Sequence, residues 1–316
     1  MSEAPLTCFA AIRGHQRECE FLKAAVQRQR LPHALLFSGP DGIGKRSVAV
    51  ALAAWLQCEA GGDDACGGCA SCRQVGAGTH PDVQLVAVAP GKKEIGIDRM
   101  REIKKFMQLQ PLRGRAKLAI VDDAHALTAA AQNALLKTLE EPPDRSFLIL
   151  VADNPDGLLP TVRSRCQRVQ FAPLPTETVA DILVTAHGIE PRAAHDLAAL
   201  AEGSPGRGLS LSGSLGTLAS DRFRALLAGL RGARYVRLME LANELAESDV
   251  DLSVKLELLL SHCRTEAMAS LDSEPAAVRS ALARADAVHH AHTALRRSNP
   301  NRQLLLDALL LQLARP

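Results

Sequence analysis

The stretch GPDGIGKRSV (residues 39–48) decides the fold, because it nearly matches the phosphate-binding pattern G-x-x-x-x-G-K-[ST]. The apolar run ALLFS (34–38) precedes it, and KRSVAVALAAWLQ (45–57) follows with helical character. A strand, a glycine loop and a helix in this order are the setting in which such a loop binds phosphate. The candidate phosphate-binding residues are Gly39, Gly42, Gly44 and Lys45.

The residue after Lys45 departs from the pattern. The pattern places there a Ser or Thr whose hydroxyl holds Mg²⁺, but this chain has Arg46, and a guanidinium cannot ligate a metal. Ser47 does not replace the hydroxyl, because one position further along a helix is rotated by about 100° and raised by about 1.5 Å. We therefore expect the loop to bind phosphate through backbone N–H groups without supporting efficient hydrolysis, with ATP or ADP as candidate ligands.

A second part of a nucleotide site follows the apolar run in AKLAIVDD (116–123). In such sites the first acid of a pair holds Mg²⁺ and the second, usually Glu, positions the attacking water. Asp122 and Asp123 take these places, and Asp123 is one methylene shorter than Glu. A displacement of about 1 Å can lower a rate by about a hundredfold. The alternative is a polar strand end that only caps a turn.

The rest of the chain predicts an α/β domain followed by helical domains. Three more short apolar runs read as strands: DVQLVAV (82–88), SFLILVA (146–152) and QRVQF (167–171). Helical segments lie between some of them, which indicates a parallel sheet covered on both faces. From Thr176 onward only helical segments follow, with breaks at residues 187–191, 202–208, 271–275 and 297–301. We expect an α/β P-loop domain at 1–172, a small helical domain at 173–211 and a larger one at 212–316.

Four cysteines lie close together within the first domain. Cys58, Cys66, Cys69 and Cys72 have the spacing C-x7-C-x2-C-x2-C, with turn residues between them. Four thiolates close a tetrahedral Zn²⁺ site and leave no position open for catalysis, so the sequence predicts a structural zinc module at 58–72. An iron–sulfur cluster and a loop of unpaired cysteines are the alternatives.

Composition sets limits on partners and compartment. Lys plus Arg is 37 and Asp plus Glu is 35 among 316 residues, so the net charge of +2 gives no general attraction for nucleic acid. The first residues lack the pattern of a secretory signal, and no apolar run approaches the ~20 residues of a membrane span. We expect a cytoplasmic protein with no membrane partner.

One arginine invites two interpretations. Arg165, in TVRSRCQRVQF, precedes the last predicted strand, where it can act as a finger on a phosphoryl group held by a neighbouring chain. The other interpretation is a solvated surface arginine, one of three in RSRCQR.

Taken together, these stretches resemble the clamp-loader branch of the AAA+ ATPases, and in particular the clamp-loader subunits of bacterial DNA polymerase III. The residues that carry the resemblance are LPHALLFSGPDGIGK (31–45), the cysteine cluster, ALLKTLEEPP (134–143), SRC (164–166) and NPNRQLLLDALLLQL (299–313). The resemblance implies an AAA+ domain, a helical lid and a helical collar that joins five subunits in a ring. It implies the γ/τ motor and δ subunits, the sliding clamp and primer–template DNA as partners.

The resemblance also implies roles for single residues. Arg165 matches the arginine that reaches a neighbouring ATP site, and Lys45, Asp122 and Asp123 match the loop lysine, the Mg²⁺ acid and the catalytic acid. It implies membership of a DNA polymerase holoenzyme, although we expect this chain to have no polymerase activity and little or no ATPase activity.

The departures from the family pattern weaken hydrolysis. The second-sensor arginine is expected where Gly206 stands, with Arg207 one place later, and the first sensor falls on Asp153 or Asn154. With Arg46 as well, the pattern favours a stator that completes its neighbour's site. Two other functions stay open: a γ/τ-type motor subunit of the same loader, and an unrelated P-loop kinase or NTPase with a structural zinc.

Overall fold

The computed structural model describes residues 7–113, 115–215, 275–298 and 301–314, with separate positions between 238 and 268. The chain divides into two compact units. The first is Met1–Ile189 with Glu202–Arg207, and the second is Glu190–Ala201 with Gly208–Pro316. The finer division into three domains, with boundaries near residues 172 and 211, stays a prediction.

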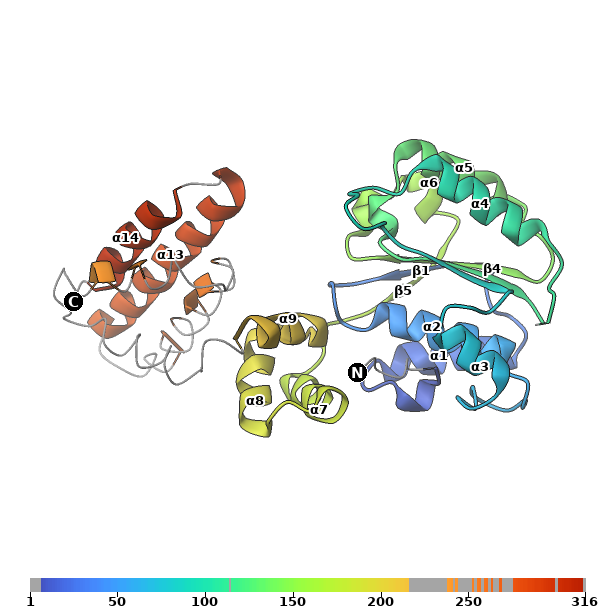
Figure 1. Cartoon of the computed structure of the whole chain (residues 1–316), viewed down its shortest axis with the longest axis horizontal. Coiled ribbons are helices and arrows are strands. Elements are labelled where there is room, and N and C mark those ends of the chain that lie inside the picture. The colour runs from blue at the N-terminus through green and yellow to red at the C-terminus, as the bar shows by residue number, and fades with distance from the viewer. Residues whose placement is uncertain are drawn as a thin grey trace. The chain divides into compact units, whose positions relative to one another are not determined.

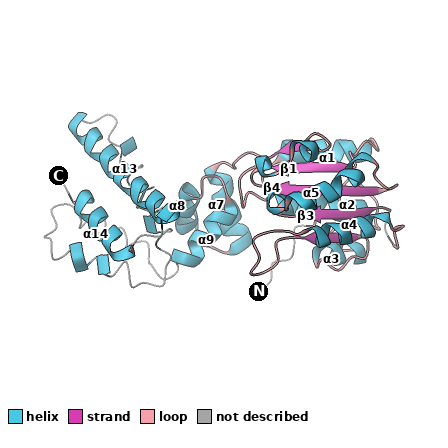
Figure 2. Ribbon diagram, turned by 90° about the horizontal axis from the view of Figure 1, so that it is seen from above, coloured by secondary structure: helices cyan, strands magenta, loops and turns pink. Residues whose placement is uncertain are grey.

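The first unit is built on a five-stranded parallel sheet in the order β2-β3-β4-β1-β5. Its strands are β1 (Ala34–Ser38), β2 (Val83–Val86), β3 (Lys117–Val121), β4 (Ser146–Ala152) and β5 (Gln167–Gln170). They run side by side in the same direction (Figure 2). Each strand lies within an apolar run from which it was predicted, so the expected α/β class with a parallel sheet is confirmed.

Helices cover both faces of this sheet. One layer holds α1 (Gln16–Gln27), α2 (Lys45–Gln57) and α3 (Ala70–Gly76), and the opposite layer holds α4 (Ile97–Gln108), α5 (Ala129–Glu140) and α6 (Pro160–Arg163) (Figure 1). Three short 3₁₀ turns, η1 (Phe9–Ala11), η2 (Ala124–Ala126) and η3 (Pro155–Gly157), connect the elements. The connections from strand to helix to strand place the loop after β1 at the carboxyl edge of the sheet.

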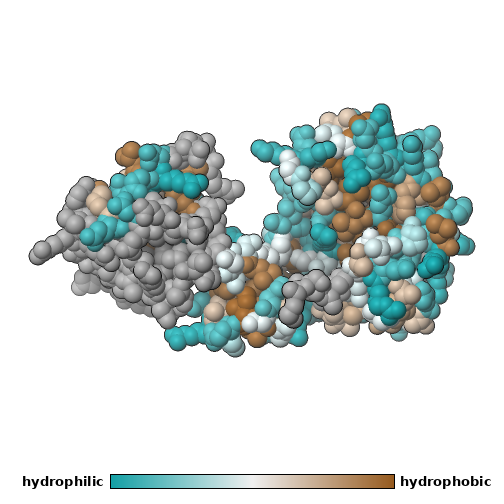
Figure 3. Space-filling view, in the orientation of Figure 1, coloured by the Kyte–Doolittle hydropathy of each residue, from teal (hydrophilic) through white to brown (hydrophobic). Residues whose placement is uncertain are grey.

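The core of this unit lies on both faces of the strands. Along β1, Leu35 and Phe37 pack into the cluster under α2, whereas Ala34 and Leu36 pack into the cluster under α4 and α5. This alternation follows from the two-residue period of a strand, and burial of each large side chain contributes about 1.5–3 kcal/mol. The hydrophobic atoms that reach the visible surface of this unit gather along the level of the sheet, between the helix layers (Figure 3).

One ion pair is buried at the start of the sheet. Lys117 Nζ lies 2.9 Å from Asp82 Oδ1, and both side chains are almost fully buried. The carboxylate of Asp82 also accepts the backbone N–H groups of Leu112 and Arg113 at 2.8 Å each. Lys117 also lies over the ring of Phe106, at 4.5 Å. These contacts satisfy both buried charges, as burial requires.

The end of the first unit is the helix α7 (Thr176–His187) and the segment 202–207. The predicted break at 202–208 is too long, because α9 (Pro205–Leu215) already begins at Pro205. Proline suits the first position of a helix, since its fixed φ is helical and its missing N–H would have no helical partner there.

The second unit is helical in its described part. It contains α8 (Pro191–Leu200), most of α9, α13 (Pro275–Ser298) and α14 (Arg302–Leu313). The buried side chains of α14 are Leu306, Leu309, Leu310 and Leu313. The predicted collar at 212–316 is described only in part, because residues 216–237 and 269–274 lie outside the described residues. Within the described chain, no helix is both long and apolar enough to cross a bilayer.

Candidate functional site

The predicted phosphate-binding residues lie in the loop between β1 and α2. α2 begins at Lys45, and Gly44 before it has a φ of +102°, a conformation that side chains other than glycine rarely adopt. This turn places the N–H groups of the first turn of α2 at the loop, where a helix N-terminus attracts phosphate. The local geometry of a phosphate-binding loop is therefore present.

The lysine of the loop already has partners within the chain. Lys45 is buried, and its Nζ donates to the carbonyl oxygens of Gly39 at 2.7 Å and Pro40 at 2.5 Å, and to Asp153 Oδ1 at 2.8 Å. An ammonium group has three donors, so all three are used. A phosphate at this loop would have to displace at least one of these contacts.

The same contact separates the two first-sensor candidates. Asp153 faces the loop and pairs with Lys45. The side chain of Asn154 instead accepts the backbone N–H of Asp156 at 2.9 Å and caps η3. Asp153 is therefore the one of the two that lies at the candidate nucleotide site.

Arg46 contacts the acid that would hold the metal of an active site. Its Nη1 is 3.4 Å from Oδ2 of Asp122, the predicted Mg²⁺ acid. Burial raises the pKa of Asp122, the charge of Asp123 raises it further, and Arg46 opposes this rise. The exposed guanidinium thus gives the partly buried carboxylate a positive partner in place of a metal.

The second acid lies on a turn beside two further polar side chains. Asp123 has a φ of +52°, and its N–H donates to Asp122 Oδ1 at 3.2 Å. One ligand atom from each of Asp123, His125 and Asp153 lies within 4.8 Å of the others. Sequence reasoning missed His125, although DDAH places it two residues after the acidic pair.

The end of the loop that faces the segment 202–207 is held closely. The N–H of Gly206 donates to the carbonyl oxygen of Gly42 at 2.9 Å, and the hydroxyl of Ser204 donates to that of Asp41 at 2.8 Å. A side chain at Gly42 would approach Ser204 Oγ to 2.6 Å. The side chain of Arg207 pairs with Glu202 at 2.7 Å.

Arg165 lies near the amino-terminal ends of the strands, whereas the phosphate-binding loop lies at their carboxyl ends. It precedes β5, and β5 pairs in parallel with β1, with Gln167 beside Leu35 and Gln170 beside Ser38. The loop follows the far end of β1, about 13 Å further along at roughly 3.3 Å per residue. Arg165 therefore cannot serve the loop of its own chain.

The three arginines of RSRCQR (163–168) differ in their partners. Arg165 donates to Glu140 Oε1 at 2.6 Å and to the carbonyl oxygen of Thr161 at 3.0 Å. Arg163 pairs with Asp156, and Arg168 donates to the buried hydroxyl of Ser38. Arg165 is partly exposed and reaches from the end of α6 to the end of α5.

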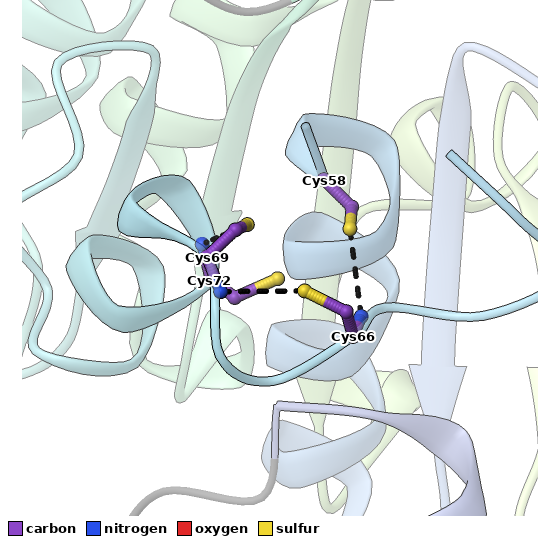
Figure 4. A group of neighbouring side chains, drawn as sticks. All are labelled: Cys58, Cys66, Cys69 and Cys72. Carbon is purple, nitrogen blue, oxygen red and sulfur yellow. Dashed lines mark hydrogen bonds between the residues drawn. The ribbon is translucent and has the colours of Figure 1, made fainter. Parts of the chain in front are cut away.

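The four clustered cysteines converge on one point. One sulfur from each of Cys58, Cys66, Cys69 and Cys72 lies within 4.8 Å of the others. Cys58 follows α2, Cys66 lies in the loop, and Cys69 and Cys72 lie at the start of α3 (Figure 4). The backbone N–H group of each of the last three cysteines, Cys66, Cys69 and Cys72, donates to the sulfur of the cysteine before it in the cluster, at 3.3–3.4 Å.

The thiols are suited to a metal. Burial opposes ionisation of Cys69, but N–H groups of Cys72 and Glu59 and neighbouring thiols lower its pKa to about 6. Burial raises the pKa of Cys72, and the thiol of Cys69 adds to the rise. Thiolate is the form that binds metal. Cys69 therefore ionises readily, and a bound cation would stabilise the thiolate of Cys72. The donor set fits a structural zinc, and sulfur donors also fit an iron–sulfur cluster.

The loop inside this cluster also holds the segment of η1. The carboxylate of Asp64 accepts the N–H groups of Phe9 at 3.0 Å and Ala10 at 2.9 Å. Phe9 is buried and meets the ring of Trp55 edge-on, at 6.0 Å between centroids. Sequence reasoning missed Asp64, because an aspartate among turn residues carries no signal of a distant partner.

A parallel sheet with a glycine loop after β1 and paired acids after β3 defines the P-loop fold. The family model described as DNA polymerase III, delta subunit, matches residues 14–175. The chain belongs to this family, which confirms the resemblance to the clamp-loader subunits.

Several curated relatives are similar to the chain. The delta' subunit of DNA polymerase III from Escherichia coli is 39% identical over 193 residues, which are 61% of this chain and 58% of that protein. The tau subunit from the same organism is 34% identical over 298 residues, 87% of this chain and 46% of that protein. The delta' subunit of Bacillus subtilis is 35% identical over 168 residues, 53% of this chain and 50% of that protein. The chain spans about half the length of the curated relatives it matches.

A solved structure, a DNA polymerase III gamma subunit-related protein from Thermotoga maritima, is 21% identical. The likeness covers 94% of this chain and 98% of that one, with a TM-score of 0.46, too low to bear on function.

Proposed function

We propose that the chain is a delta'-type subunit of the DNA polymerase III clamp loader. It acts as a stator and supplies Arg165 as a finger to the ATP site of a neighbouring motor subunit while the loader places a sliding clamp on primed DNA. The observation that carries the proposal is the position of Arg165. It lies at the opposite end of the strands from the phosphate-binding loop of its own chain, so a finger there serves another chain.

The contacts at the loop are the reason to expect little or no ATPase activity in this chain. Arg46 has no hydroxyl for Mg²⁺ and pairs with the acid that would hold it. Lys45 uses its donors on the loop itself and on Asp153. Phosphoryl transfer depends on the metal and the lysine together, so a nucleotide at this loop would bind without efficient turnover. ATP and ADP are therefore candidate ligands that would be bound but not efficiently hydrolysed.

A motor function of γ/τ type is the second candidate. It is favoured by the match to the tau subunit, which covers 87% of this chain at 34% identity. The delta' subunit of the same organism has the higher identity, 39% over 61% of this chain, and Arg46 stands against a motor function. We therefore retain the stator.

Zinc in the cysteine cluster would have a structural role. Cys58, Cys66, Cys69 and Cys72 would hold it, and four protein ligands leave no open position for a reacting water. The metal would fix the loop that carries Asp64.

The partners proposed from the resemblance are the γ/τ and δ subunits in a pentameric ring, with the clamp and primer–template DNA, in the cytoplasm. A feature of α14 supports an assembly role for the predicted collar. Leu304 and Leu311 are 68% and 38% exposed, and with the exposed Ala308 between them they form an apolar stripe at helical spacing. Such a stripe suits packing against another subunit.

ATP turnover by a reconstituted loader, stimulated by clamp and primed DNA, tests the proposal. We expect Lys45→Ala in this chain to be nearly harmless and Arg165→Ala to slow the adjoining site, since an arginine finger contributes about 10³–10⁵-fold. Equal damage by Lys45→Ala would restore the motor function. No damage by Arg165→Ala would remove the finger.

A further inference from the structure

The carboxylate that contacts Arg165 occupies an unfavourable position in its helix. Glu140 is the last residue of α5, and Glu141 follows as the C-cap. The C-terminal end of a helix carries the negative end of the helix dipole, which favours cations such as Lys137 and disfavours carboxylates. Helix stability therefore does not explain a glutamate here, and its contact with Arg165 does.

The two contacts of Arg165 fix its guanidinium from two directions. Nη2 donates to Glu140 Oε1 on α5 at 2.6 Å, and Nη1 donates to the carbonyl oxygen of Thr161 on α6 at 3.0 Å. The backbone beneath is also held, because the N–H of Arg165 donates to the carbonyl oxygen of Val162 at 3.2 Å. A long side chain that would otherwise sample many rotamers is thus confined to one region.

These contacts leave the arginine able to bind an anion. A guanidinium has five N–H donors, and the two contacts use two of them. The remaining three stay available for a phosphate while the glutamate and the carbonyl hold the group. Arg165 is also 36% exposed, so it is accessible from solvent. The arrangement orients the arginine and does not withdraw it.

We propose that Glu140 is a positioning residue for the Arg165 finger. It holds the guanidinium in the orientation that the neighbouring site needs, so that less rotamer freedom is lost when the phosphoryl group arrives. This inference rests on the proposed function of Arg165. It adds a residue on α5 to the set on which catalysis in the neighbouring chain depends.

The test uses the complete reconstituted loader with Glu140→Ala, Glu140→Gln and Arg165→Ala in this chain. For Glu140→Ala we expect kcat of ATP turnover to fall about two- to fivefold, the range that the strength of so exposed an ion pair allows. KM for ATP should be unchanged, because nucleotide binding depends on the neighbour's own loop. Glu140→Gln, which keeps an acceptor oxygen, should restore part of kcat.

A matched control comes from the adjacent pair of Arg163 and Asp156, another exposed arginine–carboxylate contact nearby. Asp156→Ala should leave kcat unchanged. A double-mutant cycle completes the design: Glu140→Ala should add nothing to Arg165→Ala, since the glutamate acts only through the arginine.

Three results would overturn the inference: a raised kcat with Glu140→Ala, which would mean that the glutamate sequesters the finger; an equal fall with Asp156→Ala; or an additive effect on the Arg165→Ala background. These results differ from failure of the proposed function, in which Arg165→Ala itself leaves turnover intact.

Discussion

Replacing Gly206 with Ala tests the contact between α9 and the phosphate-binding loop. The new Cβ would lie 2.8 Å from the Cα of Gly42 and 3.1 Å from its carbonyl oxygen. Both neighbours are backbone atoms, so the loop or the helix must shift. Overpacking of this kind costs about 1–3 kcal/mol, and weakening the 2.9 Å hydrogen bond from Gly206 to Gly42 costs about 1 kcal/mol more.

The helix itself would gain from the same change. Ala at a helical position is about 1 kcal/mol more favourable than Gly, so the net loss is about 2 kcal/mol. That corresponds to a fall of about 4–8 °C in Tm for a unit of this size. Calorimetry measures the Tm, and hydrogen exchange at the amide of residue 206, which donates to the carbonyl oxygen of Gly42, should become faster in the variant.

Gly213 provides the control in the same helix. No heavy atom lies within 4 Å of where its Cβ would be, so Gly213→Ala has only the helical gain and should raise stability by up to about 1 kcal/mol. The reasoning is refuted if Gly206→Ala melts at or above the wild-type temperature, as Gly213→Ala is expected to do. In that case the contact between Gly42 and Gly206 would not constrain the loop.

Three further predictions concern two carboxylates and the cysteine cluster. Asp82→Asn leaves Lys117 buried without its counter-ion, so the free energy of unfolding in urea should fall by about 3–5 kcal/mol; a fall under 1 kcal/mol would contradict this. Asp122 has a pKa raised above its ordinary 3.8, so the folded protein binds that proton more tightly than the unfolded chain and loses stability as pH rises from about 4. Asp122→Asn should therefore raise Tm at pH 7, with a gain that shrinks toward pH 4; a constant gain would refute the linkage. Cys66→Ser, or chelation of the metal proposed for the cysteine cluster, should speed trypsin cleavage at the exposed Arg13, because the loop that holds η1 loses an anchor; unchanged cleavage would show that the cluster does not hold the N-terminal segment in place.

Local sequence predicted the elements well because their signals are local. The alternation from apolar run to glycine loop to helix depends on neighbouring residues, and α2 occupies the predicted 45–57. The cysteine cluster was equally accessible, since its four cysteines lie within 15 residues of sequence and converge in the structure. The ends of three predicted breaks were wrong in the same way, because Pro191, Pro205 and Pro275 were taken as breakers although each begins a helix.

The contacts that decide function were not accessible in this way. Asp153 lies 108 residues from Lys45, and Glu140 lies 25 residues from Arg165. A charged residue on a surface helix has no periodic pattern that names its partner, so such pairs emerge only when the sheet brings their elements together. The sequence predicted that Arg46 could not hold a metal, but its pairing with Asp122 needed the structure.

The strand order of the sheet has a consequence for the growing chain during synthesis. β1 is made first, yet its two neighbours are β4 and β5, the last two strands to be made. Its backbone groups have no strand partner until Ser146 and the residues after it have left the ribosome. A nascent chain shorter than this carries a mostly apolar five-residue strand segment with both edges open, the kind of segment that pairs with other chains. The protection of ALLFS before that point is a task for chaperones or for the early helices, α1 and α2, that flank it in sequence.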